Sequence, residues 1–370
     1  MKRIKRKNNS NKVFSRGSQI PGYIVSETVD FWMTGGLSVL TMLGLLLLAF
    51  TTGEPSRNAL GAIGGMIVFQ ALINWPHFIG AYGLLYRSTS QIKKYQTATI
   101  WVPVVLVLIL FGATSVGDLK NGVVFKVNYD IAYLIWIIAA FYLAWHYAGQ
   151  AWGLIASFSF LSETEYRGRE RQLIRWGVKT LIIWHVIWGA EDLPVSWLMG
   201  LHGALSVAQN LVNVVCIVNF LIGSFIWWSI YQRQHRLDRR ILAVWLSIYL
   251  WYLVLYFSPD AYPFIQLSHA LQYLIFPLRV EMNKRHFQNK TNLSSKQNLW
   301  IIGYGVILVS VGLIIFWVPN YFSDPAQIIT FSAFIASLVA IHHYFVDSCI
   351  WKISNPDVRN KLFAHLNRKK

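Results

Sequence analysis

The sequence is dominated by apolar segments that are each long enough, or nearly so, to cross a membrane as a helix. A bilayer core about 30 Å thick needs roughly 20 apolar residues in a helix. The segments are 31–51, 58–86, 96–113, 129–161, 176–195, 201–230, 241–257, 261–280, 299–318 and 327–351. This pattern predicts an all-α, polytopic integral membrane protein with about ten transmembrane helices.

Basic residues are distributed unevenly between the connections. If the N-terminus lies inside the cell, 29 of the 33 Lys and Arg residues fall in inside segments and three in outside segments, while Lys179 lies at the end of a span. Cytoplasmic loops carry such an excess of Lys and Arg. We therefore expect both termini to be cytoplasmic, with basic tails 1–29 and 352–370 flanking a single transmembrane domain, 30–351, in the cell membrane.

The net charge of +17 does not indicate nucleic acid, because the charges cluster in the short connections. Topology and attraction to anionic lipid head groups account for them. The only cysteines, Cys216 and Cys349, lie in apolar segments, so the sequence predicts neither a disulfide framework nor a cysteine-based metal site. The expected partners are membrane lipids.

Histidines occur at unusual places in this sequence. Seven of the ten lie in predicted spans: His77, His146, His185, His202, His269, His342 and His343. Ionisable side chains in a membrane are costly and usually mark a functional site. Four of them lie ten residues from the inner-face basic residue of their span: His77, His185, His269 and His342. Ten helical residues span about 15 Å, so we expect these imidazoles near the middle of the bilayer.

Amide, hydroxyl and carboxyl side chains accompany these histidines at helical spacing. They are Asn74 before His77, Gln150 after His146, Gln272 and Tyr273 after His269, and Asp347 after His343. A ligating imidazole normally donates its second N–H to a carboxylate, amide or carbonyl. Metal or haem binding, a proton or ion relay, and hydrogen bonding between helices all fit this pattern.

We predict a buried metal centre whose ligands come from His77, His146, His185, His269, His342, His343 and Asp347. Asn74, Gln150, Gln272 and Tyr273 are expected to support these ligands. Imidazole-rich sites without thiolate suit iron, copper or zinc. Iron, as one ion or as a di-iron pair, is favoured because an apolar bundle admits lipid-soluble substrates. Adjacent helical residues point about 100° apart, so His342 and His343 either straddle one centre, serve two centres, or include one residue that supports a ligand.

The expected function is that of a non-haem iron-dependent oxidoreductase of the oxygenase, hydroxylase or desaturase type. Its substrate would be a lipid or another apolar small molecule, and a redox partner would supply electrons. The alternatives are a haem b protein in quinol-linked electron transfer, which needs two histidines on facing helices, and a proton-coupled membrane transporter.

A second polar group lies toward the predicted outer face. Glu191 and Asp192 end one span and His202 begins the next. Ser206, Gln209 and Asn213 extend a polar stripe at helical spacing from His202. These residues could line an access channel for a substrate or a quinone, or they could form polar contacts with a loop.

Histidines contributed by many membrane helices resemble the plan of membrane non-haem iron enzymes, which include fatty-acid desaturases and carotenoid-cleaving oxygenases. The sequence contains neither the HxxxH nor the HxxHH box of desaturases. The run Ile341-His342-His343-Tyr344 resembles the His-His pair of haem–copper oxidases, although over only four residues. These resemblances imply metal-dependent redox chemistry and assign no family.

Overall fold

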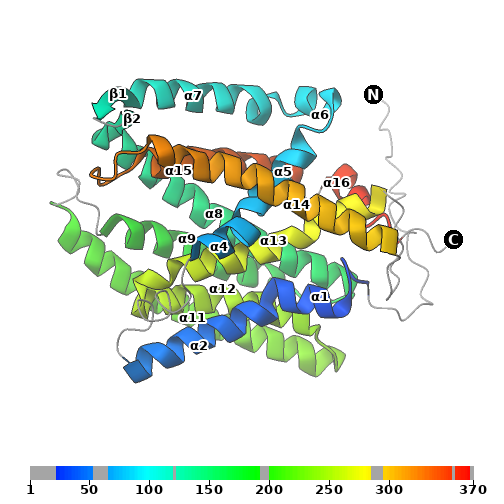
Figure 1. Cartoon of the computed structure of the whole chain (residues 1–370). Helices are drawn as coiled ribbons and strands as arrows, with labels where there is room; N and C mark the ends of the chain where they lie inside the picture. Colours follow the sequence, from blue (N-terminus) through cyan, green and yellow to red (C-terminus); the bar gives the residue numbers. More distant parts are fainter. Residues whose placement is uncertain are drawn as a thin grey trace, which may run out of the picture.

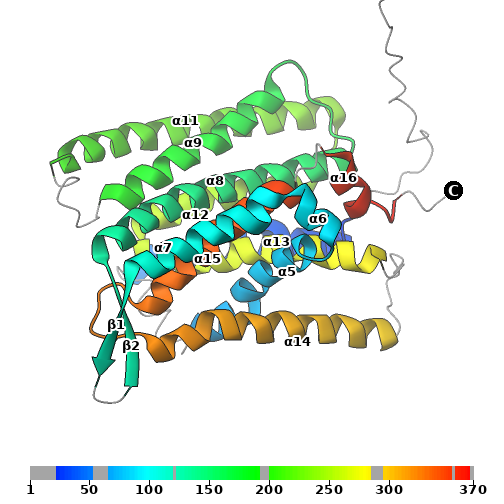
Figure 2. The ribbon, with the colours of Figure 1, turned by 90° about the horizontal axis from the view of Figure 1, so that it is seen from above.

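The structure, a computed structural model, describes residues 22–52, 66–119, 122–191, 200–284, 295–351 and 355–366. These residues are almost entirely helical, apart from one antiparallel pair of strands, β1 (Thr114–Leu119) and β2 (Gly122–Val127). The long helices pack side by side in a bundle (Figures 1 and 2). The predicted all-α class is therefore confirmed.

Three helical segments each contain one π-helical turn, which widens the helix by one residue per turn. The first segment consists of α1 (Glu27–Phe31), the π-helical turn η1 (Trp32–Gly36) and α2 (Leu37–Thr52). The second consists of α4 (Met66–Phe69), the π-helical turn η2 (Gln70–Asn74) and α5 (Trp75–Leu85). The third begins with the π-helical turn η3 (Thr97–Trp101) and continues as α7 (Val102–Ala113).

The other long helices are regular. They are α8 (Tyr129–Leu161), α9 (Glu170–Glu191), α11 (His202–Gln234), α12 (Arg239–Phe257), α13 (Tyr262–Lys284), α14 (Ser295–Trp317) and α15 (Phe331–Ile350). Short helices complete the described chain: α6 (Thr89–Lys94), α16 (Pro356–Leu362) and the 3-10 turns η4 (Pro259–Ala261) and η5 (Val318–Phe322).

Side-chain caps mark where several helices begin. Asn128 accepts a hydrogen bond from the Ile131 amide at the start of α8, and Thr330 accepts one from the Ala333 amide at the start of α15. Such caps satisfy amides that have no partner within the helix. The two helices that carry His146 and His343 therefore start at positions fixed by local sequence.

Six helical segments are long and apolar enough to cross a membrane. They are Glu27–Thr51, Tyr129–Leu161, His202–Gln234, Arg239–Phe257, Ser295–Phe322 and Phe331–Ile350. The described part of each of the other four predicted ranges also contains a helix, but that helix is shorter, interrupted or more polar. Helix α13, for example, carries Gln266, His269 and Gln272 within its length. A multi-pass helical membrane protein is the class that these features define.

Ion pairs join the elements at one end of the bundle. The buried Asp30 of α1 contacts Arg240 of α12 at 3.3 Å, and Arg240 also pairs with Asp238 at 2.6 Å. Asn283 of α13 donates to the Lys361 and Leu362 carbonyls of α16. The β-hairpin lies at the opposite end of the bundle (Figure 1).

Candidate metal centre

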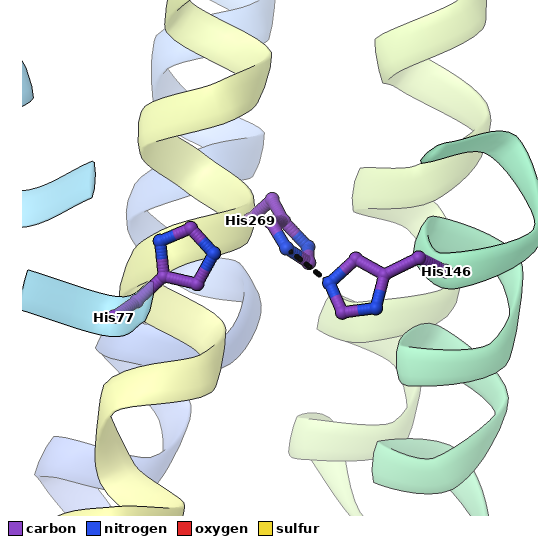
Figure 3. A group of neighbouring side chains, drawn as sticks. All are labelled: His77, His146 and His269. Atoms are coloured by element: carbon purple, nitrogen blue, oxygen red, sulfur yellow. Dashed lines mark hydrogen bonds between the residues drawn. The ribbon is translucent and has the colours of Figure 1, made fainter. Parts of the chain in front are cut away.

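Four helices bring one buried imidazole each to the middle of the bundle. His77 comes from α5, His146 from α8, His269 from α13 and His343 from α15, and none of them is more than 8% exposed. Asp347 lies one turn after His343 on the same helix and is 7% exposed. Figure 3 shows three of these imidazoles pointing toward one another. The cluster thus joins residues from most of the length of the chain.

The first group of donor atoms is formed by His77, His146 and His269, each of which offers one ring nitrogen within 4.8 Å of the other two. The Nε2 atoms of His146 and His269 are 2.9 Å apart (Figure 3). Two neutral imidazoles share such a contact only if one nitrogen carries a proton. A cation coordinated by both nitrogens would replace that proton. For comparison, imidazole nitrogen binds zinc at about 2.0–2.1 Å.

The second group consists of His146, His343 and Asp347, whose donor atoms also lie within 4.8 Å of one another. The Asp347 Oδ2 atom is 3.6 Å from His146 Nδ1 and 3.4 Å from His343 Nε2. The two groups share His146, which turns Nε2 toward the first and Nδ1 toward the second. The arrangement can hold one ion in either group, or two ions on opposite sides of the His146 ring.

Several donor atoms in the cluster make no hydrogen bond of acceptable geometry with a described residue, although Asp347 Oδ2 lies 3.4 Å from His343 Nε2. They are His77 Nε2, His269 Nδ1, both ring nitrogens of His343, and Asp347 Oδ2. A buried polar group without a partner costs about 1–3 kcal/mol. A metal ion coordinated by these atoms would remove that cost, because metal bonds satisfy the lone pairs. The donor set therefore fits a metal better than it fits hydrogen bonding between helices alone.

Contacts behind the donor atoms orient the ligands. The His77 Nδ1 atom contacts the Asn74 carbonyl, which fixes the proton on Nδ1 and leaves the Nε2 lone pair facing the cluster. The Tyr273 hydroxyl donates to Asp347 Oδ1 at 2.9 Å and accepts from Trp351 Nε1 at 2.7 Å. A carboxylate held in this way keeps its second oxygen free to bind a cation.

Two glutamines link the helices around the cluster. Gln150 Nε2 donates to the His269 carbonyl at 3.0 Å and lies 3.3 Å from Gln272 Oε1. Gln272 in turn donates to the Ser247 hydroxyl of α12 at 3.2 Å. Gln150 and Gln272 therefore support the backbone around His269, and neither forms a hydrogen bond with its ring.

The π-helical turn η2 lies immediately before the helix that carries His77. Its last residue, Asn74, supplies the carbonyl that holds His77, while its side chain donates to Gln70 at 2.5 Å. Gln70 donates to Gln266 of α13 at 3.2 Å. Turns of this kind occur often at functional sites, since they shift a side chain out of the regular helical register.

His185 and His342 belong to neither donor group of the described residues. His185 is buried on α9 with its ring centroid 6.3 Å from that of Tyr147, and Tyr147 in turn lies 4.5 Å from the His269 ring. His342 turns away from the cluster, since its Nε2 atom lies 2.8 Å from the Ala98 carbonyl. His343 is thus the member of the pair that faces the centre.

The second predicted group is only partly described. Glu191 ends α9 and His202 begins α11, while Asp192 lies outside the described residues. Neither Glu191 nor His202 belongs to a described group of three metal-ligand side chains. The stripe on α11 instead meets α9 through Asn213, which accepts a 2.6 Å hydrogen bond from Trp184 Nε1.

Sequence reasoning missed Trp351, Ser247 and the Asn74 carbonyl. Trp351 follows the last residue of α15 and lies four residues after Asp347, and this helical spacing was the available signal. Ser247 and the carbonyl carry no comparable signal.

The fold and the cluster define a helical membrane protein with a buried histidine–aspartate site that can hold metal. Comparison with known proteins adds no family to this description: no family model matches the chain, and neither a curated protein nor a solved structure is significantly similar to it.

Proposed function

We propose that this protein is an intramembrane non-haem iron oxidoreductase that acts on a lipid or another apolar substrate. The observation that carries the proposal is the set of unpartnered donor atoms on His77, His269, His343 and Asp347 around the shared ring of His146. Iron held by imidazoles and a carboxylate supplies redox and dioxygen chemistry. The chain positions the ion, orients its ligands and excludes bulk water.

The choice of metal rests on the donor types. Four imidazoles and one carboxylate suit iron, copper or zinc, whereas magnesium and calcium prefer sites made only of oxygen atoms. A mononuclear zinc site would use three or four of these donors. The two overlapping donor groups favour a centre that uses all five, as one ion or as a di-iron pair.

The spacing of the imidazoles favours a non-haem centre over haem b. The ring centroids of His146 and His269 are 4.6 Å apart, and those of His77 and His343 are 4.7 Å apart. A haem with two axial histidines needs an open slot for the porphyrin between the rings. Side chains fill the space around these imidazoles, including Phe78, whose ring lies 4.5 Å from that of His343.

The proposal includes the topology. Ten helices would cross the cell membrane, with both termini in the cytoplasm, and the centre would lie near mid-membrane. Contact between the first and last described segments supports placing the two termini on one side, since His365 Nε2 lies 2.6 Å from the Tyr23 carbonyl. The excess of Lys and Arg in alternate connections supports the cytoplasm as that side.

Metal analysis of the purified full chain, combined with its visible absorption spectrum, tests the proposal. We expect stoichiometric iron without the sharp Soret band of haem. A Soret band would instead assign the haem b function. Protein without bound iron, copper or zinc after purification in metal-supplemented medium would contradict the metal centre and favour the proton-coupled transporter.

A further inference from the structure

Two adjoining cavities lie beside the metal centre, between α5, α13, α14 and the short helices at the ion-paired end of the bundle. The larger has a volume of about 370 Å³ and lies between α5 and α14, which pack side by side (Figure 2). The smaller has a volume of about 130 Å³. Arg87 lines both, so one side chain connects them.

The larger cavity is apolar over most of its wall. Ile79 of α5 and Ile307, Leu308, Val311 and Ile315 of α14 line it. From Tyr304 to Ile315 the α14 wall extends about 16 Å at 1.5 Å per residue. Gly83 leaves a gap in the α5 wall, since a Cβ atom added there would meet nothing within 4 Å. These dimensions and this chemistry suit a hydrocarbon chain.

The smaller cavity is strongly basic. Its charged lining consists of Arg87, Lys94, Lys284 and Lys361 against a single carboxylate, Asp357. Lys94 pairs with Asp357 at 2.8 Å, and Arg87 and Lys284 both contact Glu281 in the neighbouring wall. Even after these pairs, basic groups outnumber acidic ones. Basic pockets between transmembrane helices at the cytoplasmic face bind anionic lipid head groups, and guanidinium groups bind phosphate with two parallel hydrogen bonds.

The apolar cavity also approaches the metal centre. Tyr82 lines it, and the Tyr82 ring centroid is 6.4 Å from that of His343 and 5.1 Å from that of His342. Tyr82 and Ile79 lie on α5, the helix that carries His77. A chain lying against Tyr82 would therefore have one aromatic ring between it and the donor cluster.

We infer that this pair of cavities binds a lipid with a phosphate head group, its phosphate among Arg87, Lys94 and Lys284 and its chain between α5 and α14. The inference that a lipid binds here is based on the two cavities and does not depend on the proposed function. Its assignment as the substrate class of the centre rests on the proposed function. Arg87 and Glu281 form the boundary between the head-group part and the chain part of this site.

Binding of phosphatidylglycerol to the purified full chain, measured by native mass spectrometry, tests the inference. We expect Lys94→Gln to weaken binding about fivefold, the factor that corresponds to the contribution of one basic residue near an anionic surface. Lys93→Gln is the matched control, because Lys93 is the exposed neighbour on α6 and does not line the cavity. Equal losses in the two variants would show diffuse attraction and overturn the head-group site.

A second substitution tests the apolar cavity, which would hold the hydrocarbon chain of the lipid. Gly83→Leu fills the gap in the α5 wall and should abolish tight binding, whereas Gly44→Leu on α2, where an added Cβ also meets nothing within 4 Å, should leave it unchanged. Retained binding in Gly83→Leu, or equal affinity for phosphatidylglycerol and zwitterionic phosphatidylcholine in the unsubstituted protein, would overturn the inference.

Iron content measured on the same samples separates the two proposals. Selective lipid binding without iron would leave the lipid site standing and contradict the metal centre. Bound iron without selective lipid binding would support the metal centre and contradict the lipid site.

Discussion

At the scale of single residues, the cluster separates the histidines of the described segments into those that can share an ion and those that belong to neither donor group. His269 belongs to a donor group and His342 does not, although each lies ten residues before a basic residue in the sequence. Substitution of these two histidines therefore compares a candidate ligand with a histidine outside both donor groups.

We expect His269→Gln to lose its metal and His342→Gln to keep it. Substitutions behind a metal ligand already lower affinity about 10–100-fold, so loss of a ligand itself should exceed that range. Gln at position 342 can still donate to the Ala98 carbonyl that His342 now contacts. Metal-to-protein ratios after dialysis against a chelator provide the measurement. Equal retention by both variants would remove His269 from the ligand set.

Tyr273 provides a test of the contacts that orient Asp347. Tyr273→Phe removes the hydroxyl between Asp347 and Trp351, and we expect about 10–100-fold weaker metal binding. Tyr82→Phe is the control, because the Tyr82 hydroxyl donates to the Val339 carbonyl. Competition against a chelator of known affinity measures both variants. Equal affinity of Tyr273→Phe and the unsubstituted protein would mean that the hydroxyl does not hold the carboxylate.

The sequence predicted only some of the histidines that converge, because it does not encode how each helix is rotated about its axis. Counting ten residues along the sequence from a basic residue selected His77 and His269, which the structure brings into one donor group. The same count selected His185, whose helix lies on the far side of Tyr147. Helix rotation depends on packing between distant segments, and no local pattern encodes it.

At the scale of helices and strands, regular helices were predictable from apolar runs and caps, and irregular turns were not. The π-helical turn at Gln70–Asn74 places the Asn74 carbonyl at His77. One extra residue in a helical turn leaves no distinct signature in composition. The strands of the β-hairpin, Thr114–Leu119 and Gly122–Val127, lie in the connection between the predicted spans 96–113 and 129–161, for which the sequence predicted no strands.

The close contact between η1 and α12 predicts how substitution of a glycine at this contact changes the stability of the protein. A Cβ atom at Gly35 would lie 2.7 Å from the Ala243 Cβ atom, whereas one at Gly44 meets nothing within 4 Å. We expect Gly35→Ala to destabilise the protein by about 1–3 kcal/mol through overpacking of η1 against α12. Gly44→Ala should leave stability unchanged or raise it, because alanine favours helix by about 1 kcal/mol over glycine.

Thermal unfolding of both variants in the same detergent measures the difference. Small residues allow membrane helices to approach closely, and this is the role assigned to Gly35. If Gly35→Ala and Gly44→Ala melt at the same temperature, the close contact between η1 and α12 is absent.

At the scale of the whole molecule, the sequence predicts orientation through the placement of Lys and Arg, a property that no single helix carries. The β-hairpin and α16 lie at opposite ends of the bundle (Figure 1). The hairpin lies in a connection expected outside, and α16 belongs to a tail expected inside. Accessibility of these two elements in intact cells therefore tests the proposed topology directly.

Cysteine labelling provides the measurement, in a background in which Cys216 and Cys349 are replaced by alanine. Val123→Cys in the hairpin and Arg359→Cys in α16 both introduce the thiol at an exposed position. A membrane-impermeant maleimide should modify Val123→Cys in intact cells, and should modify Arg359→Cys only after the membrane is opened. The opposite pattern would mean that the protein has the reverse orientation in the membrane. Equal labelling of both variants in intact cells would mean that the bundle does not separate its two ends across a bilayer, and the buried imidazoles would then need another explanation.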